Sequence, residues 1–109
     1  MTQRNRDLLK QCIDEKWTPI VESCEALDAG SRNCALCQEY ADSNCDGCPV
    51  AIEAQDDGCG GTPYIYWARH HILRHEPNAR RRVPGCAECL RLATAERDFL
   101  QMLLDKEPT

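Results

Sequence analysis

Apolar residues in the first quarter of the chain recur at helical spacing. Their steps of four, three, four and three residues place them on one side of a helix. This stripe consists of Ile13, Trp17, Ile20, Cys24 and Leu27. Pro19 interrupts it, and because proline removes a backbone hydrogen bond, we expect a kink there with Thr18 as the N-cap of a second, nearly coaxial helix. The pattern predicts an N-terminal helical segment over residues 5–29, ended by Gly30.

Helical spacing returns in the second half of the chain. Thr62 suits an N-cap and Pro63 a first helical position, so we expect a helix over residues 63–76, a basic loop over 77–85 and a final helix over 86–105. The first of these helices places on one face Tyr64, Trp67, Ala68, His71, Ile72 and His75. The last helix places on one face Cys89, Leu92, Ala93, Glu96, Phe99, Leu100, Leu103 and Leu104. We further expect Trp17, Trp67 and Phe99 to face one another in the core.

Residues 31–63 are rich in cysteine and in the turn-forming residues Gly, Pro, Asn and Asp. One or two helical turns around residues 35–41 fit this composition, and a bound metal ion would order the rest. The sequence therefore predicts a single all-α domain over residues 1–109, a small cluster of three to four helices around a cysteine-rich, metal-stabilised loop region.

Composition changes this picture mainly through cysteine. The chain has 109 residues and nine cysteines, and its mean hydropathy of -0.57 fits no membrane span. Charged residues throughout the first twenty positions exclude the apolar stretch of a secretory signal, so we expect a cytoplasmic protein. In that reducing compartment, C-x-x-C pairs indicate metal ligands before they indicate disulfides.

The first candidate metal site consists of two C-x-x-C pairs. The candidate ligands are Cys34, Cys37, Cys45, Cys48 and Cys59. Paired C-x-x-C motifs supply the tetrahedral sulfur ligands that zinc prefers, and Cys59 could replace Cys34 as the fourth ligand. The spacing does not choose between these sets. An iron–sulfur cluster is the alternative, but the spacing does not follow the ferredoxin pattern, and a disulfide framework is another.

The second candidate metal site consists of His71, His75, Cys86 and Cys89. Histidines four residues apart share one side of a helix, and the C-x-x-C at the start of the next helix would complete a Cys₂His₂ zinc site. Alternatively, both histidines pack beside Trp67 and both cysteines are small buried apolar residues. The histidine segment lacks the glutamate of the H-E-x-x-H motif of zinc proteases, and the chain has no nucleotide-binding or hydrolase motif. We therefore expect a non-enzymatic protein.

The net charge of -5 is unevenly distributed. Residues 1–63 carry a net charge of -7, residues 64–91 carry +4, and residues 92–109 carry -2. The arginines of the basic segment are candidate nucleic-acid contacts: Arg69, Arg74, Arg80, Arg81 and Arg82. Alternatively, they solvate a helix and its following loop, or pair with the acidic N-terminal half.

Several cysteines and one aromatic motif support a family resemblance. The shared cysteines are Cys34, Cys37, Cys45, Cys48 and Cys59, followed by Thr62-Pro63-Tyr64 and Trp67. With an N-terminal helix around Trp17 and the Glu96-to-Leu104 helix, the chain resembles small cysteine-rich proteins of tailed bacteriophages and prophages, whose function is mostly unassigned. The resemblance implies a bacterial cytoplasm and supplies no mechanism. Cys86, Cys89 and the run from Arg80 to Arg82 depart from the pattern.

Two functions remain open from the sequence. We expect a zinc-stabilised interaction module that binds a host protein, with the acidic surface steering a basic partner. The alternative is a nucleic-acid-binding accessory protein that uses the segment from Arg69 to Arg91. The acidic isoelectric point of about 5.1 argues against duplex DNA.

Overall fold

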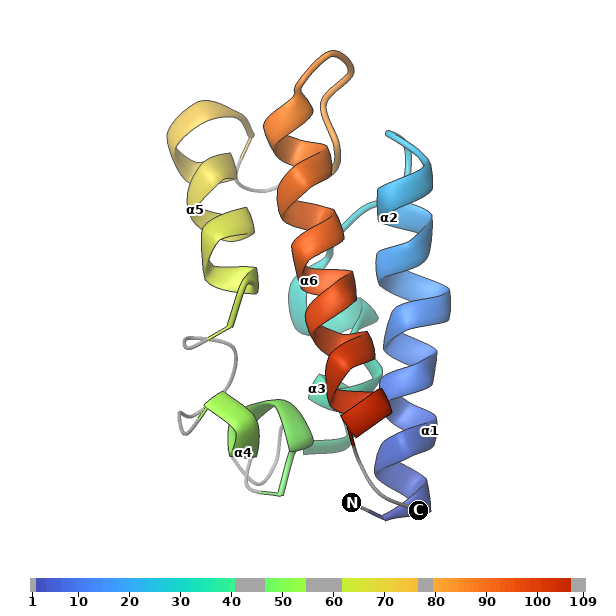
Figure 1. Ribbon diagram of the computed structural model, residues 1–109. Coiled ribbons are helices and arrows are strands. Elements are labelled where there is room, and N and C mark those ends of the chain that lie inside the picture. Colours follow the sequence, from blue (N-terminus) through green and yellow to red (C-terminus); the bar gives the residue numbers. More distant parts are fainter. Residues whose placement is uncertain (1, 41–46, 55–61, 77–79, 107–109) are drawn as a thin grey trace.

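The N-terminal part of the chain folds into one long helical run (Figure 1). The computed structural model describes residues 2–40, 47–54, 62–76 and 80–106. The run consists of α1 (Gln3–Gln11), the π-helical turn η1 (Cys12–Trp17) and α2 (Thr18–Glu22). The widened turn lies directly before Pro19, where the missing N–H and the ring disturb the ordinary hydrogen-bond ladder.

Two details of this run differ from expectation. Thr18 has helical backbone angles (φ -63°, ψ -46°), so it continues the helix instead of acting as an N-cap. The run ends at Glu22 and not near residue 29, because Ser23 is extended. As a result Leu27, expected on the buried stripe, is exposed.

The remaining elements are short except for the last. They are the 3₁₀ turn η2 (Gly30–Asn33) and the helices α3 (Ala35–Tyr40), α4 (Pro49–Ala54), α5 (Tyr64–Arg74) and α6 (Ala87–Lys106). Within the described ranges there is no strand, only an isolated bridge between Asp28 and Arg80, so the all-α prediction is confirmed. α4 was not expected, since Pro49 suggests a turn but occupies the first position of this helix, which buries Val50.

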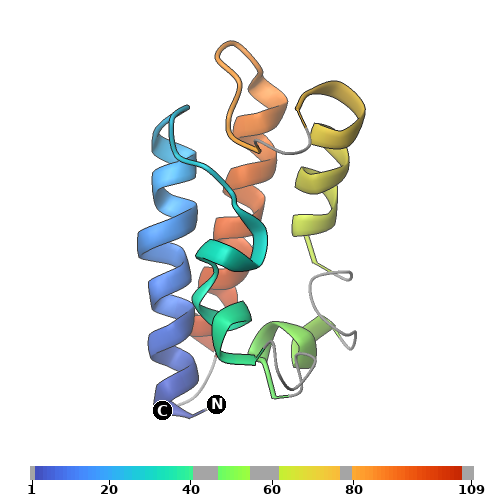
Figure 2. The ribbon, with the colours of Figure 1, turned by 180° about the vertical axis from the view of Figure 1, so that it is seen from behind.

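The long helices form the frame of the molecule. α6 runs antiparallel to the N-terminal run, and α5 packs against α6 (Figure 1). α3 packs against α1, and α4 lies with α3 towards the end of the molecule where α1 begins and α6 ends (Figures 1 and 2). The end of α5 and the start of α6 meet at the opposite end.

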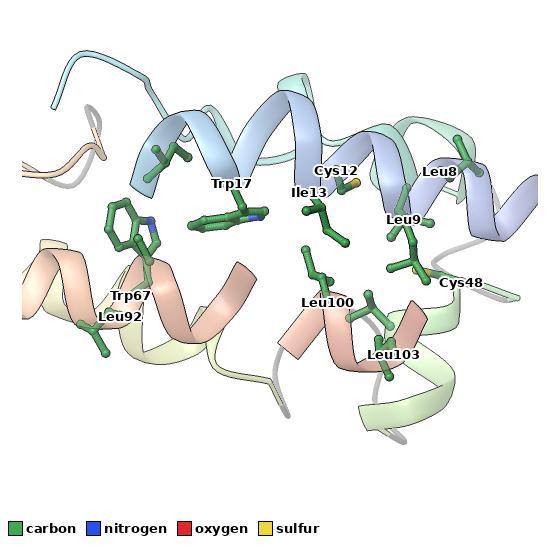
Figure 3. Packing of buried hydrophobic residues seen from close by; sticks show 14 of the residues in the cluster. Leu8, Leu9, Cys12, Ile13, Trp17, Cys48, Trp67, Leu92, Leu100 and Leu103 are labelled. Carbon is green, nitrogen blue, oxygen red and sulfur yellow. The ribbon is translucent and has the colours of Figure 1, made fainter. Parts of the chain in front are cut away.

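The apolar core lies between the N-terminal run and α6 (Figure 3). Its buried apolar residues are Leu8, Leu9, Cys12, Ile13, Trp17, Ile20, Leu36, Cys48, Val50, Trp67, Cys89, Leu92, Ala93, Leu100 and Leu103. Trp17 and Trp67 meet edge to face with ring centroids 5.6 Å apart. Phe99, expected to face both, is only partly buried at the margin of this cluster.

A buried carboxylate organises the polar part of the core. Asp28 is 2% exposed, and its Oδ1 lies 2.9 Å from the Lys16 Nζ and accepts the backbone N–H of Gly30. Its Oδ2 accepts hydrogen bonds from the Tyr64 hydroxyl, the Trp67 indole N–H and the Arg80 guanidinium. Burial alone would raise the pKa of Asp28, but the charge and hydrogen bond of Lys16, with the other donors, lower that pKa to about 2.

Replacing this carboxylate should destabilise the whole fold. Asp28→Asn leaves the Lys16 ammonium buried without its counter-ion, so we expect a loss of about 3–5 kcal/mol in the free energy of unfolding, measured by urea denaturation. The exposed Asp14→Asn is the control and should change it by less than about 0.5 kcal/mol. In the wild type, the stabilisation from Asp28 should be lost as the pH falls from about 3.8 towards 2. A near-neutral Asp28→Asn variant would contradict this role.

Glu96 on α6 is buried without a comparable set of donors. It is 3% exposed, and its Oε1 has no hydrogen-bond partner within the described structure. Burial raises the pKa of Glu96 to about 8, against the opposing charge of Lys16. The carboxyl is therefore protonated in the folded protein at pH values where it ionises in the unfolded chain.

This raised pKa predicts a pH-dependent loss of stability. Between pH 4.5 and about 8 the folded state holds the proton that the unfolded state releases, so the free energy of unfolding should fall as the pH rises, by a few kcal/mol in order of magnitude. Urea denaturation in the presence of a chelator should show this fall in the wild type and in the exposed-site control Glu22→Gln. Glu96→Gln should lack it; an unchanged pH profile in that variant would refute the raised pKa.

Candidate metal centre

The start of α6 presents two cysteines through a tight turn. In the segment Val83-Pro84-Gly85-Cys86, the Cys86 N–H donates to the Val83 carbonyl at 2.9 Å, and Gly85 has φ of +83°. Proline at the second position and a glycine with positive φ at the third are the requirements of a type II turn. The turn leads directly into α6, so Cys86 lies just before the helix and Cys89 lies on its first turn.

The end of α5 presents two histidines to the same place. α5 ends at Arg74, and His75 is extended (φ -137°, ψ -153°). Leaving the helix at this point turns the His75 ring towards His70, with ring centroids 4.8 Å apart. The two histidines are five positions apart in the sequence, a spacing that a continuous helix would not place on one side.

These four residues form one compact cluster. The ligand atoms of His70, His75, Cys86 and Cys89 all lie within 4.8 Å of one another. The Cys86 Sγ lies 3.4 Å from the His75 Nε2 and 3.5 Å from the His70 Nε2. Cys89 is fully buried, and the other three are half-buried. The cluster can hold a metal ion that joins α5 to α6.

His70, and not the expected His71, completes this cluster. His71 is fully buried and packs against Trp67, with ring centroids 4.3 Å apart and an angle of 50° between the ring planes. Its Nδ1 lies 2.9 Å from the Trp67 carbonyl oxygen and its Nε2 lies 2.9 Å from the Arg81 carbonyl oxygen. Both carbonyl oxygens are acceptors, so a neutral ring with a single N–H donates to only one of them, and the Nε2 also lies 3.9 Å from the Cys89 sulfur. The packing alternative describes the position of His71 beside Trp67. The expected partners His75, Cys86 and Cys89 are brought together.

The surroundings favour the metal-binding form of His70, the neutral imidazole, and disfavour that of Cys89, the thiolate. Burial, with the nearby imidazoles of His75 and His71, lowers the pKa of His70, which keeps it the neutral imidazole that binds metals. Burial raises the pKa of Cys89 to about 11, so its thiol is protonated without a metal. Metal binding at this centre should therefore release a proton.

The cysteine-rich segment is described only in part. Cys45 and Cys59 lie outside the described residues, so the five-cysteine site stays a prediction. Cys48 directly precedes α4 and belongs to the apolar core cluster, where it lies near Leu9 (Figure 3). Cys34 precedes α3, and its Sγ accepts the backbone N–H of Cys37 at 3.3 Å.

A cysteine that no motif indicates joins this pair. Cys12, at the start of η1, is 3% exposed, and its Sγ lies 4.0 Å from the Cys34 Sγ. Hydrogen bonds from the thiols of Cys12 and Cys37 hold the pKa of Cys34 far below its usual value. Cys12 directly precedes Ile13, the first residue of the buried stripe, so helical spacing gave no signal for it.

Part of the basic segment has structural partners. Arg80 binds Asp28, and the Arg82 guanidinium donates to the Val21 carbonyl at 2.6 Å. Arg81 is exposed, and its backbone carbonyl contacts His71. The pairing alternative therefore describes Arg80, whereas Arg69 and Arg74 line a shallow groove beside the metal cluster.

Comparisons with known proteins supply no relative. The chain matches no protein-family model, no curated protein and no solved structure. In the described part of the chain, no helix combines the length and the apolar character needed to cross a membrane.

The ligand set can be tested by removing the histidine that the sequence did not indicate. His70→Ala should lower the number of bound ions by one, because losing a ligand should cost more than the 10–100-fold in affinity typical of outer-shell changes. The measurement is titration with Co²⁺, whose visible absorption reports tetrahedral coordination, together with metal analysis. Arg69→Ala, its neighbour on α5, should bind as the wild type does. Unchanged binding by His70→Ala would favour the ligand set containing His71.

Proposed function

We propose that the protein is a zinc-stabilised, non-enzymatic module that binds another protein. The observation that carries the zinc assignment is the geometry of the His70, His75, Cys86 and Cys89 cluster. Zinc bonds of about 2.0–2.1 Å to nitrogen and 2.3 Å to sulfur, at tetrahedral angles, separate the two ligand atoms by about 3.5 Å. The observed separations of 3.4 and 3.5 Å from the Cys86 Sγ agree with this value.

Four protein ligands favour a structural role over a catalytic one. A catalytic zinc keeps a coordination position open for water or substrate, whereas two imidazoles and two thiolates fill a tetrahedral site. The ion would hold the end of α5 against the start of α6. Its binding free energy would then add to the stability of a small core.

The groove between α5 and α6 is the surface best suited to a partner. It has a volume of about 220 Å³ and includes among its lining residues Tyr66, Arg69, His70, Leu73, Arg74 and Arg91. Tyr66 and Leu73 are 59% and 71% exposed, and tyrosine and arginine are enriched in protein interfaces. Glu88 also lines the groove and pairs with Arg91, which leaves Arg69 and Arg74 to give the groove a basic character. Although the whole chain is acidic, the partner segment should therefore carry acidic and apolar side chains and not the basic ones expected from net charge.

Metal and groove are connected through His70. This residue is a metal ligand candidate and also lines the groove, so the ion would fix one wall of the binding surface. The sequence resemblance to phage and prophage proteins supports a bacterial host protein as the partner. Because Arg80 and Arg82 have intramolecular partners, the nucleic-acid alternative has fewer cations available than the sequence suggests.

Peptide selection on the zinc-loaded protein would test the groove. A displayed library of random peptides should yield sequences that combine acidic with aliphatic or aromatic residues. The double variant Arg69→Glu/Arg74→Glu should bind them at least tenfold more weakly, which is about 1.4 kcal/mol. The control Arg4→Glu/Lys10→Glu carries the same charge change on α1 and should bind like the wild type.

Two outcomes would contradict the proposal. One is the selection of peptides whose binding does not depend on Arg69 and Arg74. The other is tight binding of duplex DNA that weakens steeply with salt and is lost in Arg69→Ala/Arg74→Ala/Arg81→Ala, which would favour the nucleic-acid function. Zinc content is measured separately by native mass spectrometry before and after a chelator, and a metal-free protein of unchanged stability would refute the zinc assignment.

A further inference from the structure

Two cysteines that are not part of the α5–α6 cluster meet inside the fold. Cys12 begins the π-helical turn η1, and Cys34 directly precedes α3, which packs against α1. Their sulfur atoms lie 4.0 Å apart, close enough for either thiol to donate a weak hydrogen bond to the other. Cys12 is 3% exposed and Cys34 is half-buried, so Cys34 is the more accessible member of the pair.

We infer that Cys12 and Cys34 form a redox-active dithiol that exchanges with small-molecule disulfides. Within the described residues, the two sulfurs belong to no group of three or more possible metal ligands. A disulfide needs only two sulfurs, and its bond of about 2.05 Å requires this pair to approach by about 2 Å, a movement within the range of side-chain rotation. In a reducing compartment such disulfides are usually transient, and they serve catalysis or redox sensing.

The contacts of the Cys34 sulfur suit it to be the attacking atom. The backbone N–H of Cys37 donates to it at 3.3 Å, and the Cys12 thiol is placed to donate to it as well. Hydrogen bonds to a sulfur favour its charged form, and the thiolate is the form that attacks a disulfide. The Cys12 thiol, already beside this sulfur, is the group that completes the exchange.

The pair also has a route to solvent. A cavity of about 240 Å³ lies between η1 and α3, and its lining includes Cys12 and both chain neighbours of Cys34, which are Asn33 and Ala35. This volume is below the roughly 300–1,000 Å³ of a typical ligand pocket. The cavity therefore admits the reacting end of a small disulfide and does not enclose a whole ligand.

The exchange takes two steps and needs no reactant besides the small disulfide, RSSR. The Cys34 thiolate attacks one sulfur of RSSR, which forms a mixed disulfide between Cys34 and RS and releases one RS⁻. The Cys12 thiolate then attacks the Cys34 sulfur, which forms the Cys12–Cys34 disulfide and releases the second RS⁻. The protein loses two electrons and two protons, and RSSR becomes two molecules of RSH. The product ties the segment before α3 to the N-terminal helical run.

Peptide mapping of the reduced full-length protein after treatment with glutathione disulfide tests the inference. Free thiols are blocked at acidic pH, and cleavage after Lys, Arg and Glu leaves Cys12 alone on residues 11–15 and Cys34 with Cys37 on residues 33–39. These two peptides should be linked in the wild type and separated by a reductant. The link should persist in Cys37→Ser and disappear in Cys34→Ser. Cys24→Ser, which changes a cysteine outside the pair, should give the wild-type map.

Removing Cys12 tests the second step. In the Cys37→Ser background, Cys12→Ala should leave one glutathione on the 33–39 peptide, whereas Cys37→Ser alone should release it. The inference is overturned if the wild type gives no link between the two peptides, if the link joins Cys34 to Cys37 instead, or if Cys12→Ala retains no glutathione. The wild-type map decides the question even if the Cys12→Ala variant unfolds. Each readout is assigned to a peptide, so the result does not depend on whether the α5–α6 cluster holds zinc.

Discussion

The buried carboxylate of Asp28 holds together segments that are otherwise distant in the chain. Lys16 reaches it from the long N-terminal helix, Tyr64 and Trp67 from α5, and Arg80 from the segment that leads to α6. The Asp28 N–H adds a 2.7 Å hydrogen bond to the Arg80 carbonyl. A buried anion is stable only when it is paired and hydrogen-bonded. The requirement to pair with Asp28 therefore fixes where these donors lie.

The candidate metal centre depends on this arrangement. Fixing Arg80 places the short segment that follows it, through the Val83 to Cys86 turn, where α6 begins. Fixing Tyr64 and Trp67 sets the rotation of α5, which buries His71 and turns His70 towards Cys86. The polar core thus determines which histidine faces the cysteines. An ion bound at the cysteines and histidines would hold α5 and α6 together at their other end.

The sequence was sufficient for the elements whose signals are local. The helix beginning after Thr62 and Pro63 and the long C-terminal helix follow from caps and helical spacing, and both lie within two residues of expectation. The choice of His70 over His71 depends on where α5 ends, a single-residue boundary that spacing does not define. The helix was expected to continue through His75, whereas the chain becomes extended at that residue and changes which ring it meets.

Long-range polar contacts account for most of the rest. Nothing around Asp28 distinguishes it from the other acidic residues of the N-terminal half, because three of its partners come from α5 and the Arg80 segment and Lys16 lies twelve positions before it. Cys12 was missed for the same reason, because its partner Cys34 comes from a segment twenty-two positions further along the chain. The sequence left open whether Arg80 and Arg82 are exposed or paired, because it does not show that a buried carboxylate and a carbonyl lie beside them.

A crystal structure of the zinc-loaded protein, with diffraction data collected at the zinc absorption edge, would test the central claim most directly. The account predicts an anomalous peak bonded to the Nε2 atoms of His70 and His75 and to the sulfurs of Cys86 and Cys89, with His71 still held between the Trp67 and Arg81 carbonyls. A peak coordinated by His71, or none between α5 and α6, would contradict it.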